Sequence, residues 1–277
     1  MNDSPRRTPP FPLVLLRFWF MRILPVWCGI ALVIFLMQIA VCAIVHDNQS
    51  VKTLLKFIDL LPAIVKSALG GQSLQAGNTP GLIVIGYQHP LVLFLYMFFA
   101  VGVPTGLLTG EVQKGTMELI LSRPVTKTQV YVCAGIPALV GMFALVMVMF
   151  LGTVVATSIY DFGEPIPLDM FFRMAINGGL LASAVGAVSL LSAALFRGRN
   201  TAVGAAVAFL VVNYFVAIIA EWWPRMRSLE PFTLFHYVHG QQVVTGWPIG
   251  NIAVLTAILL IAAISGGIVW QHRDLPL

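Results

Sequence analysis

The sequence predicts an all-α integral membrane protein with six membrane-spanning helices. Hydrophobic residues make up 58% of its 277 residues and charged residues only 10%, whereas about 25% of the residues in a soluble domain are charged. The mean hydropathy is +0.90, and six separate stretches reach the roughly 20 apolar residues that a helix needs to cross a bilayer. A closed barrel is excluded because these runs are too long and too continuously apolar for barrel strands.

The six predicted spans form one transmembrane domain over residues 25–270, because nothing of domain size lies between them. A cytoplasmic N-terminus of residues 1–24 precedes this domain, and a cytoplasmic tail of residues 271–277 follows it. The predicted spans are residues 25–45, 90–110, 129–156, 171–196, 201–223 and 249–270.

The distribution of lysine and arginine predicts that both termini are cytoplasmic and that the chain is a multi-pass protein of the cytoplasmic (inner) membrane. The net charge of +5 is then a consequence of topology and of contact with the anionic lipid bilayer. Nucleic acid is not an expected partner, since no basic patch with interleaved aromatic residues stands outside the spans. Basic residues on the predicted cytoplasmic side are Arg6, Arg7, Arg17, Arg22, Lys114, Arg123, Lys127, Arg197, Arg199 and Arg273.

Three segments outside the spans have patterns of their own. Residues 11–24 are apolar but interrupted by arginines, which favours a helix lying at the inner interface; a simple extension of the first span is the alternative. In the outer loop of residues 46–89, apolar residues recur at helical spacing over residues 51–69, which predicts an amphipathic helix. Residues 72–80 are expected to form a loop. The outer segment of residues 224–248 is rich in aromatic residues and is expected to be interfacial or re-entrant.

Glycines at regular spacing mark one face of the second span. Gly102, Gly106 and Gly110 follow one another at i, i+4 and i+8, with Pro104 among them. Small residues at this spacing let another backbone approach closely, and the proline permits a bend. We expect this face to form the interface between two protomers, while packing inside one protomer remains the alternative.

A polar segment of residues 111–128 separates the second and third spans and contains helix signals. Gly115 breaks the preceding helix, Thr116 is expected to cap a new one, and Glu118 lies in its first turn. Arg123 stands at its end, and Pro124 stops it. The short helix carries apolar residues that we expect to dock a partner, with a plain solvated loop as the alternative: Met117, Leu119, Ile120 and Leu121.

The segment from Gly110 to Thr126, with His89-Pro-Leu before it, resembles the signature of ABC-2 type transporter permeases. Glu230-Pro-Phe-Thr-Leu-Phe-His-Tyr is similar to the outer segment that precedes span six in that family. The resemblance covers the whole chain in layout, although its specific motif is about twenty residues long. Many members have Ser-Arg after Pro-Val, where this chain has Thr126 and Lys127.

The resemblance implies that residues 116–122 are a coupling helix, which transmits the closure of a separate ATPase subunit to the spans. Glu111 is then placed at the hinge of the second span, and Arg123 and Lys127 are free to meet acidic groups on the ATPase or on phospholipid. It also implies a second permease protomer, which we expect to be identical, and transport in the export direction. The expected coupling residues are Glu111, Gly115, Thr116, Met117, Glu118, Leu119, Ile120, Arg123 and Pro124.

The chain itself is expected to have no catalytic residue, cofactor or metal. It lacks a G-x-x-x-x-G-K-[ST] phosphate-binding loop, so ATP and Mg²⁺ are expected on the partner ATPase. The alternative from another class is an integral membrane enzyme acting on lipid, which needs a nucleophile and a base within reach of each other. A metal site at His236 and His239, spaced i, i+3, is a weaker alternative.

Overall fold

Among the residues that the structure describes, six helices are long and apolar enough to cross a membrane, as predicted. The computed structural model describes residues 11–47, 79–237 and 246–274, and within these ranges it contains helices and no strand. The spanning elements are α1 (Leu13–His46), α5 with α6 (Thr79–Gln88 and Pro90–Leu107), α9 (Lys127–Ile159), α10 (Leu168–Leu195), α11 (Arg199–Trp222) and α13 (Ile249–His272).

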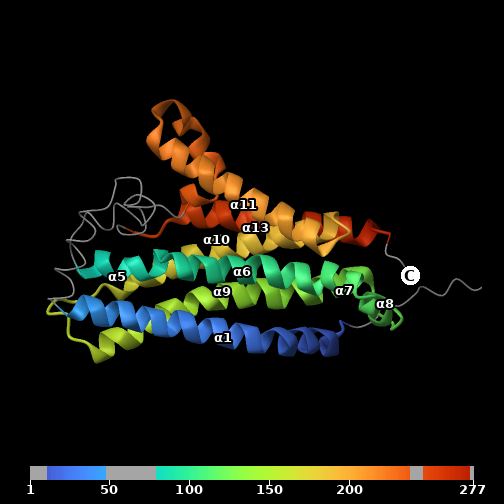
Figure 1. The fold of residues 1–277 in the computed structure, drawn as a ribbon, viewed down its shortest axis with the longest axis horizontal. Helices are drawn as coiled ribbons and strands as arrows, with labels where there is room; N and C mark the ends of the chain where they lie inside the picture. Colours follow the sequence, from blue (N-terminus) through green and yellow to red (C-terminus); the bar gives the residue numbers. More distant parts are fainter. Residues whose placement is uncertain (1–10, 48–78, 238–245, 275–277) are drawn as a thin grey trace, which may run out of the picture.

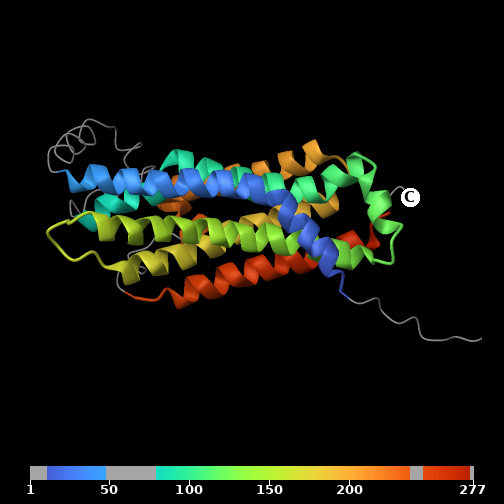
Figure 2. The same ribbon diagram turned by 90° about the horizontal axis from the view of Figure 1, so that it is seen from below.

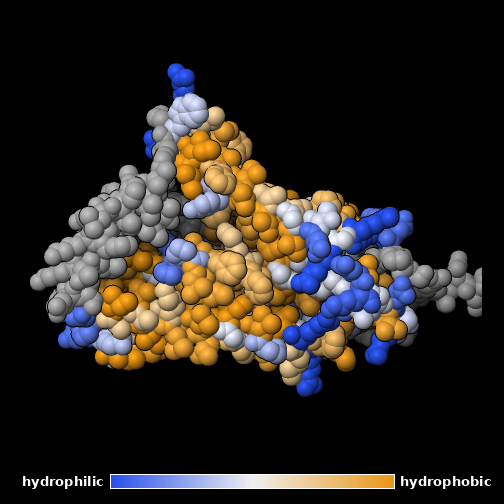
Figure 3. Space-filling view, in the orientation of Figure 1, coloured by the Kyte–Doolittle hydropathy of each residue, from blue (hydrophilic) through white to orange (hydrophobic). Residues whose placement is uncertain are grey.

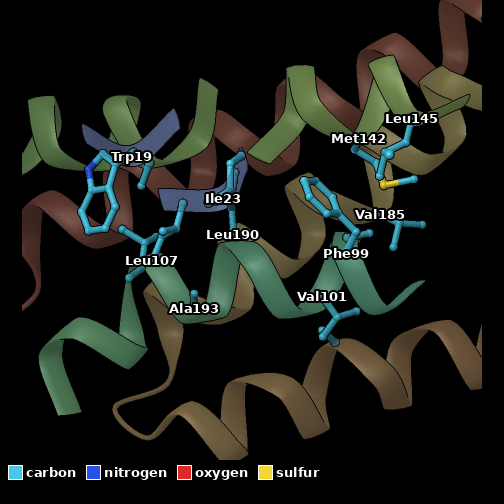
Figure 4. Packing of buried hydrophobic residues seen from close by; sticks show 14 of the residues in the cluster. Trp19, Ile23, Phe99, Val101, Leu107, Met142, Leu145, Val185, Leu190 and Ala193 are labelled. Atoms are coloured by element: carbon cyan, nitrogen blue, oxygen red, sulfur yellow. The ribbon is translucent and has the colours of Figure 1, made fainter. Parts of the chain in front are cut away.

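The long helices run along one another as an elongated bundle (Figures 1 and 2). α9 packs against both α1 and α10, and α10 also packs against α6 and α13. The core between them includes Trp19, Phe99, Met142 and Leu190, all fully buried. Figure 4 shows Trp19 of α1 beside Leu107 of α6, and Phe99 of α6 close to Met142 of α9. Helix α11 leans away from this bundle (Figure 1).

The first helix combines two predicted elements. The interfacial helix and the first span form the single helix α1, with Pro25 inside it and a bend visible in Figure 2. A proline removes one helical hydrogen bond and kinks the helix. Here the helix continues because both sides of the kink pack in the core, where Trp19, Ile23 and Ile30 are buried.

The end of the predicted outer loop is helical, which corrects the boundary of the second span. Residues 79–88 form α5, and Leu82, Ile83 and Val84 are buried against the end of α1 and the start of α10. His89 then caps α6, since its Nδ1 accepts a hydrogen bond from the Leu91 amide at 3.2 Å. The apolar run Gly81-Leu-Ile-Val-Ile-Gly was the missed signal. The predicted amphipathic helix of residues 51–69 lies outside the described residues.

The two ends of the bundle hold different elements, and hydrophilic residues gather at one of them. One end holds α7 (Thr109–Gln113) and α8 (Thr116–Leu121), and we call it the "α8 end". The starts of α1 and α9, the turn between α10 and α11 and the last turn of α13 also lie at this end. The first and last described helices therefore begin and end on the same side (Figures 1 and 2). Hydrophilic residues gather there, beside a hydrophobic belt over the middle of the bundle (Figure 3).

The described part of the opposite end carries two 3₁₀ helices, η1 (Pro224–Phe232) and η2 (Phe235–Tyr237), within the segment of residues 224–248 that we expected to be interfacial or re-entrant. Polar side chains from the spans hold these turns. Asn177 of α10 and Asn251 of α13 both donate to the Tyr237 carbonyl, at 2.6 and 2.9 Å. Asn213 of α11 accepts a hydrogen bond from the Leu234 amide at 3.0 Å. Three polar residues inside predicted spans are therefore used to fasten the chain between α11 and α13.

Candidate functional site

The chain turns twice between α6 and α8, and we call residues 107–116 the elbow. Helix α6 ends at Leu107, α7 follows after one residue, and Gly115 then adopts a left-handed conformation with φ of 73°. Glycine adopts this conformation without the steric strain that a Cβ would introduce. Because of this turn, α8 does not continue in the direction of α6. The helix is therefore interrupted at Gly115, where the sequence predicted a break.

Glu111 lies at the centre of the elbow and is only 3% exposed. Arg22 of α1 donates from Nη2 to Oε1 at 2.6 Å, and the Thr116 hydroxyl donates to Oε2 at 2.6 Å. The Lys114 ammonium lies 3.8 Å from Oε1. A buried carboxylate needs such partners, because burial without them carries a large desolvation penalty. We call this arrangement the Glu111 clamp.

The position of Thr116 corrects the predicted helix cap. Gly115 is the residue that precedes α8, and it provides no side-chain cap. The Thr116 hydroxyl instead reaches back to the Glu111 side chain and, at 3.2 Å, to the Glu111 carbonyl. Sequence spacing identified a hydroxyl at the right place for a cap, but the buried carboxylate is a stronger acceptor for it.

Opposing effects set the pKa of Glu111. Burial raises the pKa of this carboxyl, whereas the hydrogen bonds from Arg22 and Thr116 and the charges of Arg22 and Lys114 lower it. The lowering effects prevail, and the pKa lies below its ordinary value. Glu111 is therefore ionised at neutral pH and acts as an anionic anchor, not as a proton donor.

Arg22 is the partner of Glu111 that sequence reasoning missed. Its guanidinium lies 5.5 Å from the ring centre of Trp19 and 6.0 Å from that of Phe18, distances at which a cation is attracted to an aromatic face. The signal was present, since an arginine interrupts an otherwise apolar run. No local pattern connects that arginine to a glutamate 89 positions away.

The six residues of α8 divide between the core and the surface. Met117 is buried in the main hydrophobic cluster, where Trp19 and Ile23 also lie. Leu119 is 69% exposed, and Ile120 and Leu121 are partly buried against the cluster. Glu118, Arg123 and Pro124 are exposed. Of the four apolar residues that we expected at the surface, Leu119 is the one that is mostly exposed.

The three glycines of the second span have different surroundings. A Cβ on Gly106 or Gly110 would lie 3.7 or 3.6 Å from side-chain atoms of Arg199, at the start of α11. A Cβ on Gly102 would meet no atom within 4 Å. Two of the three glycines thus accommodate an arginine of the same chain, and Gly102 is the one that faces open space. The predicted protomer interface stays a prediction.

Other sequence-predicted residues are placed differently from expectation. Lys127 donates from Nζ to the Arg273 carbonyl at 2.8 Å and so fastens the end of α13. His236 lies 2.9 Å from Glu230 Oε1, while its predicted metal-binding companion His239 lies outside the described residues. Within the described ranges, no three His, Cys, Asp or Glu side chains are grouped as metal ligands.

Comparison with known proteins identifies a family to which the chain is similar and a relative in Bacillus subtilis (strain 168). A sequence model of the family described as "ABC-2 family transporter protein" matches residues 20–264. The uncharacterized protein YhcI of Bacillus subtilis (strain 168) is 23% identical over 185 residues, which cover 59% of this chain and 59% of that protein. The chain thus matches less than two thirds of that relative's length. Because the family match runs from the bend of α1 into α13, with the elbow and α8 inside it, this chain belongs to the ABC-2 transporter family.

Proposed function

We propose that this chain is the permease subunit of an ABC transporter, and that α8 docks onto a separate ATPase subunit. The observation that carries the proposal is the pairing of an exposed surface on α8 with a buried charged clamp directly behind it. The exposed surface offers a place for a partner, and the clamp joins that surface to the membrane helices.

The exposed surface of α8 suits a protein partner. We call it the "α8 face", formed by Glu118, Leu119, Ser122 and Arg123, all exposed. One protruding leucine stands among an acidic residue, a hydroxyl and a basic residue. Protein interfaces commonly have an apolar centre and a polar rim, so the α8 face fits a groove with an apolar floor and charged edges.

The link from α8 to the spans is short and direct. Met117 inserts into the core, and Thr116 hydrogen-bonds Glu111 of the elbow. Glu111 in turn accepts from Arg22 of α1. A push on α8 is therefore passed to α6 through the elbow and to α1 through the ion pair. This arrangement supports the proposed coupling of ATP hydrolysis on the partner to movement of the spans.

The distribution of charge supports a cytoplasmic α8 end. Among the described residues, that end carries Arg17, Arg22, Lys114, Arg123, Lys127, Arg197, Arg199 and Arg273, whereas the opposite end carries Arg173, Arg225 and Arg227. Basic residues are enriched in short cytoplasmic loops of membrane proteins. In the proposed orientation, within the cytoplasmic membrane, α8 faces the compartment that contains ATP, and the direction of transport is export.

Helix α11 supports the proposal that two identical copies act together. It leans away from the bundle (Figure 1). Only 17% of its most apolar stretch is buried, the same share as in α13, against 61% in α10. Val212 and Phe215 are among its large exposed side chains. We propose that α11 and the open side of α6 at Gly102 meet a second copy of this chain, with one ATPase bound to each copy.

The test is co-purification of the full-length chain from its native membrane, with mass spectrometry of bound proteins and an ATPase assay. We expect a subunit with a phosphate-binding loop to accompany the wild-type chain. Leu119→Asp should abolish this association, because it places a charge at the apolar centre of the α8 face. Phe232→Asp is the matched control, since Phe232 is 84% exposed in η1 at the opposite end.

The same preparation separates the proposal from the lipid-enzyme alternative. If both variants retain the same proteins as the wild type, or if the wild type brings no ATPase, the proposed docking is wrong. Turnover of phospholipid by the purified chain without any partner would then favour an enzyme. Elution of each variant as a single species in detergent checks that it is folded and not aggregated.

A further inference from the structure

An open pocket lies at the α8 end, away from the Glu111 clamp, between the last turns of α10 and α13. Its volume is about 490 Å³. Polar and apolar groups share its lining, which includes Leu195, Arg197, Ile268, His272, Arg273 and Asp274. The two helices are both membrane-spanning candidates that end here, at Leu195 and His272. The pocket therefore lies where a span meets the aqueous boundary.

Two arginines give the pocket its charge. Arg197 and Arg273 both line it, and burial together with the nearby charge of Arg197 lowers the pKa of Arg273. Within the described residues, neither arginine has a carboxylate within 4 Å, although Asp274 also lines the pocket. Two neighbouring cations without a paired acid repel each other, so an anion bound between them is stabilising.

The Arg273 side chain is held in position by the protein. Its Nη1 atom donates to the carbonyls of Ala193 and Ala194 in the last turn of α10, at 2.9 and 3.3 Å. Its guanidinium also lies 5.3 Å from the ring centre of Trp270. These contacts use one end of the guanidinium and fix its plane, so an anion that binds the other side does not have to order a flexible side chain.

The apolar part of the lining is exposed beside these charges. Leu195 and Ile268 are 54% and 55% exposed, and they belong to the membrane-spanning helices α10 and α13. A soluble anion makes no favourable contact with these apolar side chains, whereas a lipid presents an anionic phosphate and an acyl chain side by side. Basic pockets between spans at a membrane boundary bind acidic lipid headgroups in general.

We propose that this pocket binds an acidic phospholipid, with its phosphate held by Arg197 and Arg273 and its acyl chain lying along Leu195 and Ile268. The bound lipid joins the ends of α10 and α13. Lys127, at the start of α9, already contacts the end of α13 through the Arg273 carbonyl. The site depends on this end lying at a bilayer surface, and it is independent of the ATPase docking proposed for α8.

Native mass spectrometry of the full-length chain, titrated in detergent with phosphatidylglycerol, tests the proposal. We expect one tightly held phosphatidylglycerol per chain and no comparable binding of phosphatidylcholine. Arg197→Gln should weaken the affinity about fivefold, the effect typical of one basic residue at an acidic membrane surface. Asp274→Asn removes the only carboxylate described in the lining and should strengthen binding by a similar factor.

Arg199→Gln is the matched control, because Arg199 is exposed two positions further along the chain and is not part of the lining. Equal affinities for the wild type, Arg197→Gln and Arg199→Gln would overturn the site. Equal retention of phosphatidylcholine would overturn the role of the anionic charge. If inorganic phosphate at the same concentration binds as tightly as phosphatidylglycerol, the ligand is a free anion and the lipid assignment is wrong.

Discussion

Arg22 of α1 and Glu111 of the elbow form an ion pair with an Nη2–Oε1 distance of 2.6 Å, across 89 positions of sequence. The carboxylate is almost fully buried, and its second oxygen accepts the Thr116 hydroxyl. The first helix of the bundle is thereby fastened to the segment that carries α8. Each charged side chain therefore has a partner of opposite charge, which offsets part of the cost of burying the carboxylate.

Replacing Arg22 should destabilise the protein more than replacing Glu111. Arg22→Gln leaves a buried carboxylate with the Thr116 hydroxyl and the more distant Lys114, and we expect a loss of roughly 2 kcal/mol in the free energy of unfolding. Glu111→Gln leaves an arginine that is already 35% exposed and should be milder. Thermal unfolding of both variants and of the double variant measures this difference. Losses that simply add would show that the two side chains do not interact.

The clamp should weaken in acid. The pKa of Glu111 is lowered in the folded protein, so its ionised form stabilises the fold fully above the ordinary pKa of 4.5. That stabilisation is lost as the pH falls through the lower, folded pKa. The difference in unfolding temperature between the wild type and Glu111→Gln should therefore shrink below about pH 4.5. A difference that stays constant down to the lowest accessible pH would contradict the assignment.

Gly115→Ala should affect both stability and partner binding, because a Cβ strains the backbone at φ of 73°. No atom lies within 4 Å of that Cβ, so the expected loss of about 1 kcal/mol comes from conformation alone. Gly163→Ala is the matched control, with φ of 71° and equally open space in the connection between α9 and α10. Both variants should lose similar stability in thermal unfolding, but only Gly115→Ala should reduce ATPase co-purification. Equal effects on co-purification would show that the left-handed turn has no special role in docking.

A polar cluster inside the bundle should respond to a single added methyl group. Gln38 of α1 donates to Thr153 of α9 at 3.0 Å, and the Tyr87 hydroxyl lies 2.8 Å from the same oxygen. A Cβ on Gly86 would overlap Gln38 Oε1, so Gly86→Ala should cost about 1–3 kcal/mol through overpacking. Gln38→Ala in the same chain should recover part of that loss.

Gly29→Ala is the control for that series, because its Cβ meets no atom within 4 Å. Thermal unfolding in one detergent compares all four proteins. If Gly86→Ala is as stable as Gly29→Ala, the close approach of α5 to Gln38 does not limit packing here.

Much of the membrane architecture follows from local sequence. Apolar runs of sufficient length predicted six spans, and the six candidate helices of the structure follow the same order. The first and second spans begin earlier in the chain than predicted, and each shift has a local cause. Pro25 kinks α1 but does not end it, and the apolar residues of α5 extend the second span into the segment expected to be an outer loop.

The site was predictable only in part. Gly115 and Pro124 bound a short helix because their backbone constraints act within a few residues. Which side of α8 is buried depended on the neighbours that reach it, and Met117 packs in the cluster that contains Trp19 and Ile23. The same dependence applies to Gly106 and Gly110, whose open side is occupied by Arg199.

The sequence by itself determined that this chain is a helical membrane protein with a polar segment between its second and third spans, because hydropathy and backbone preferences are properties of short segments. Only the tertiary structure decided that Glu111 pairs with Arg22 and that Arg273 and Arg197 share one pocket. Ion pairing and burial are set by distances between helices. Local sequence patterns do not give those distances for residues that lie far apart in the chain.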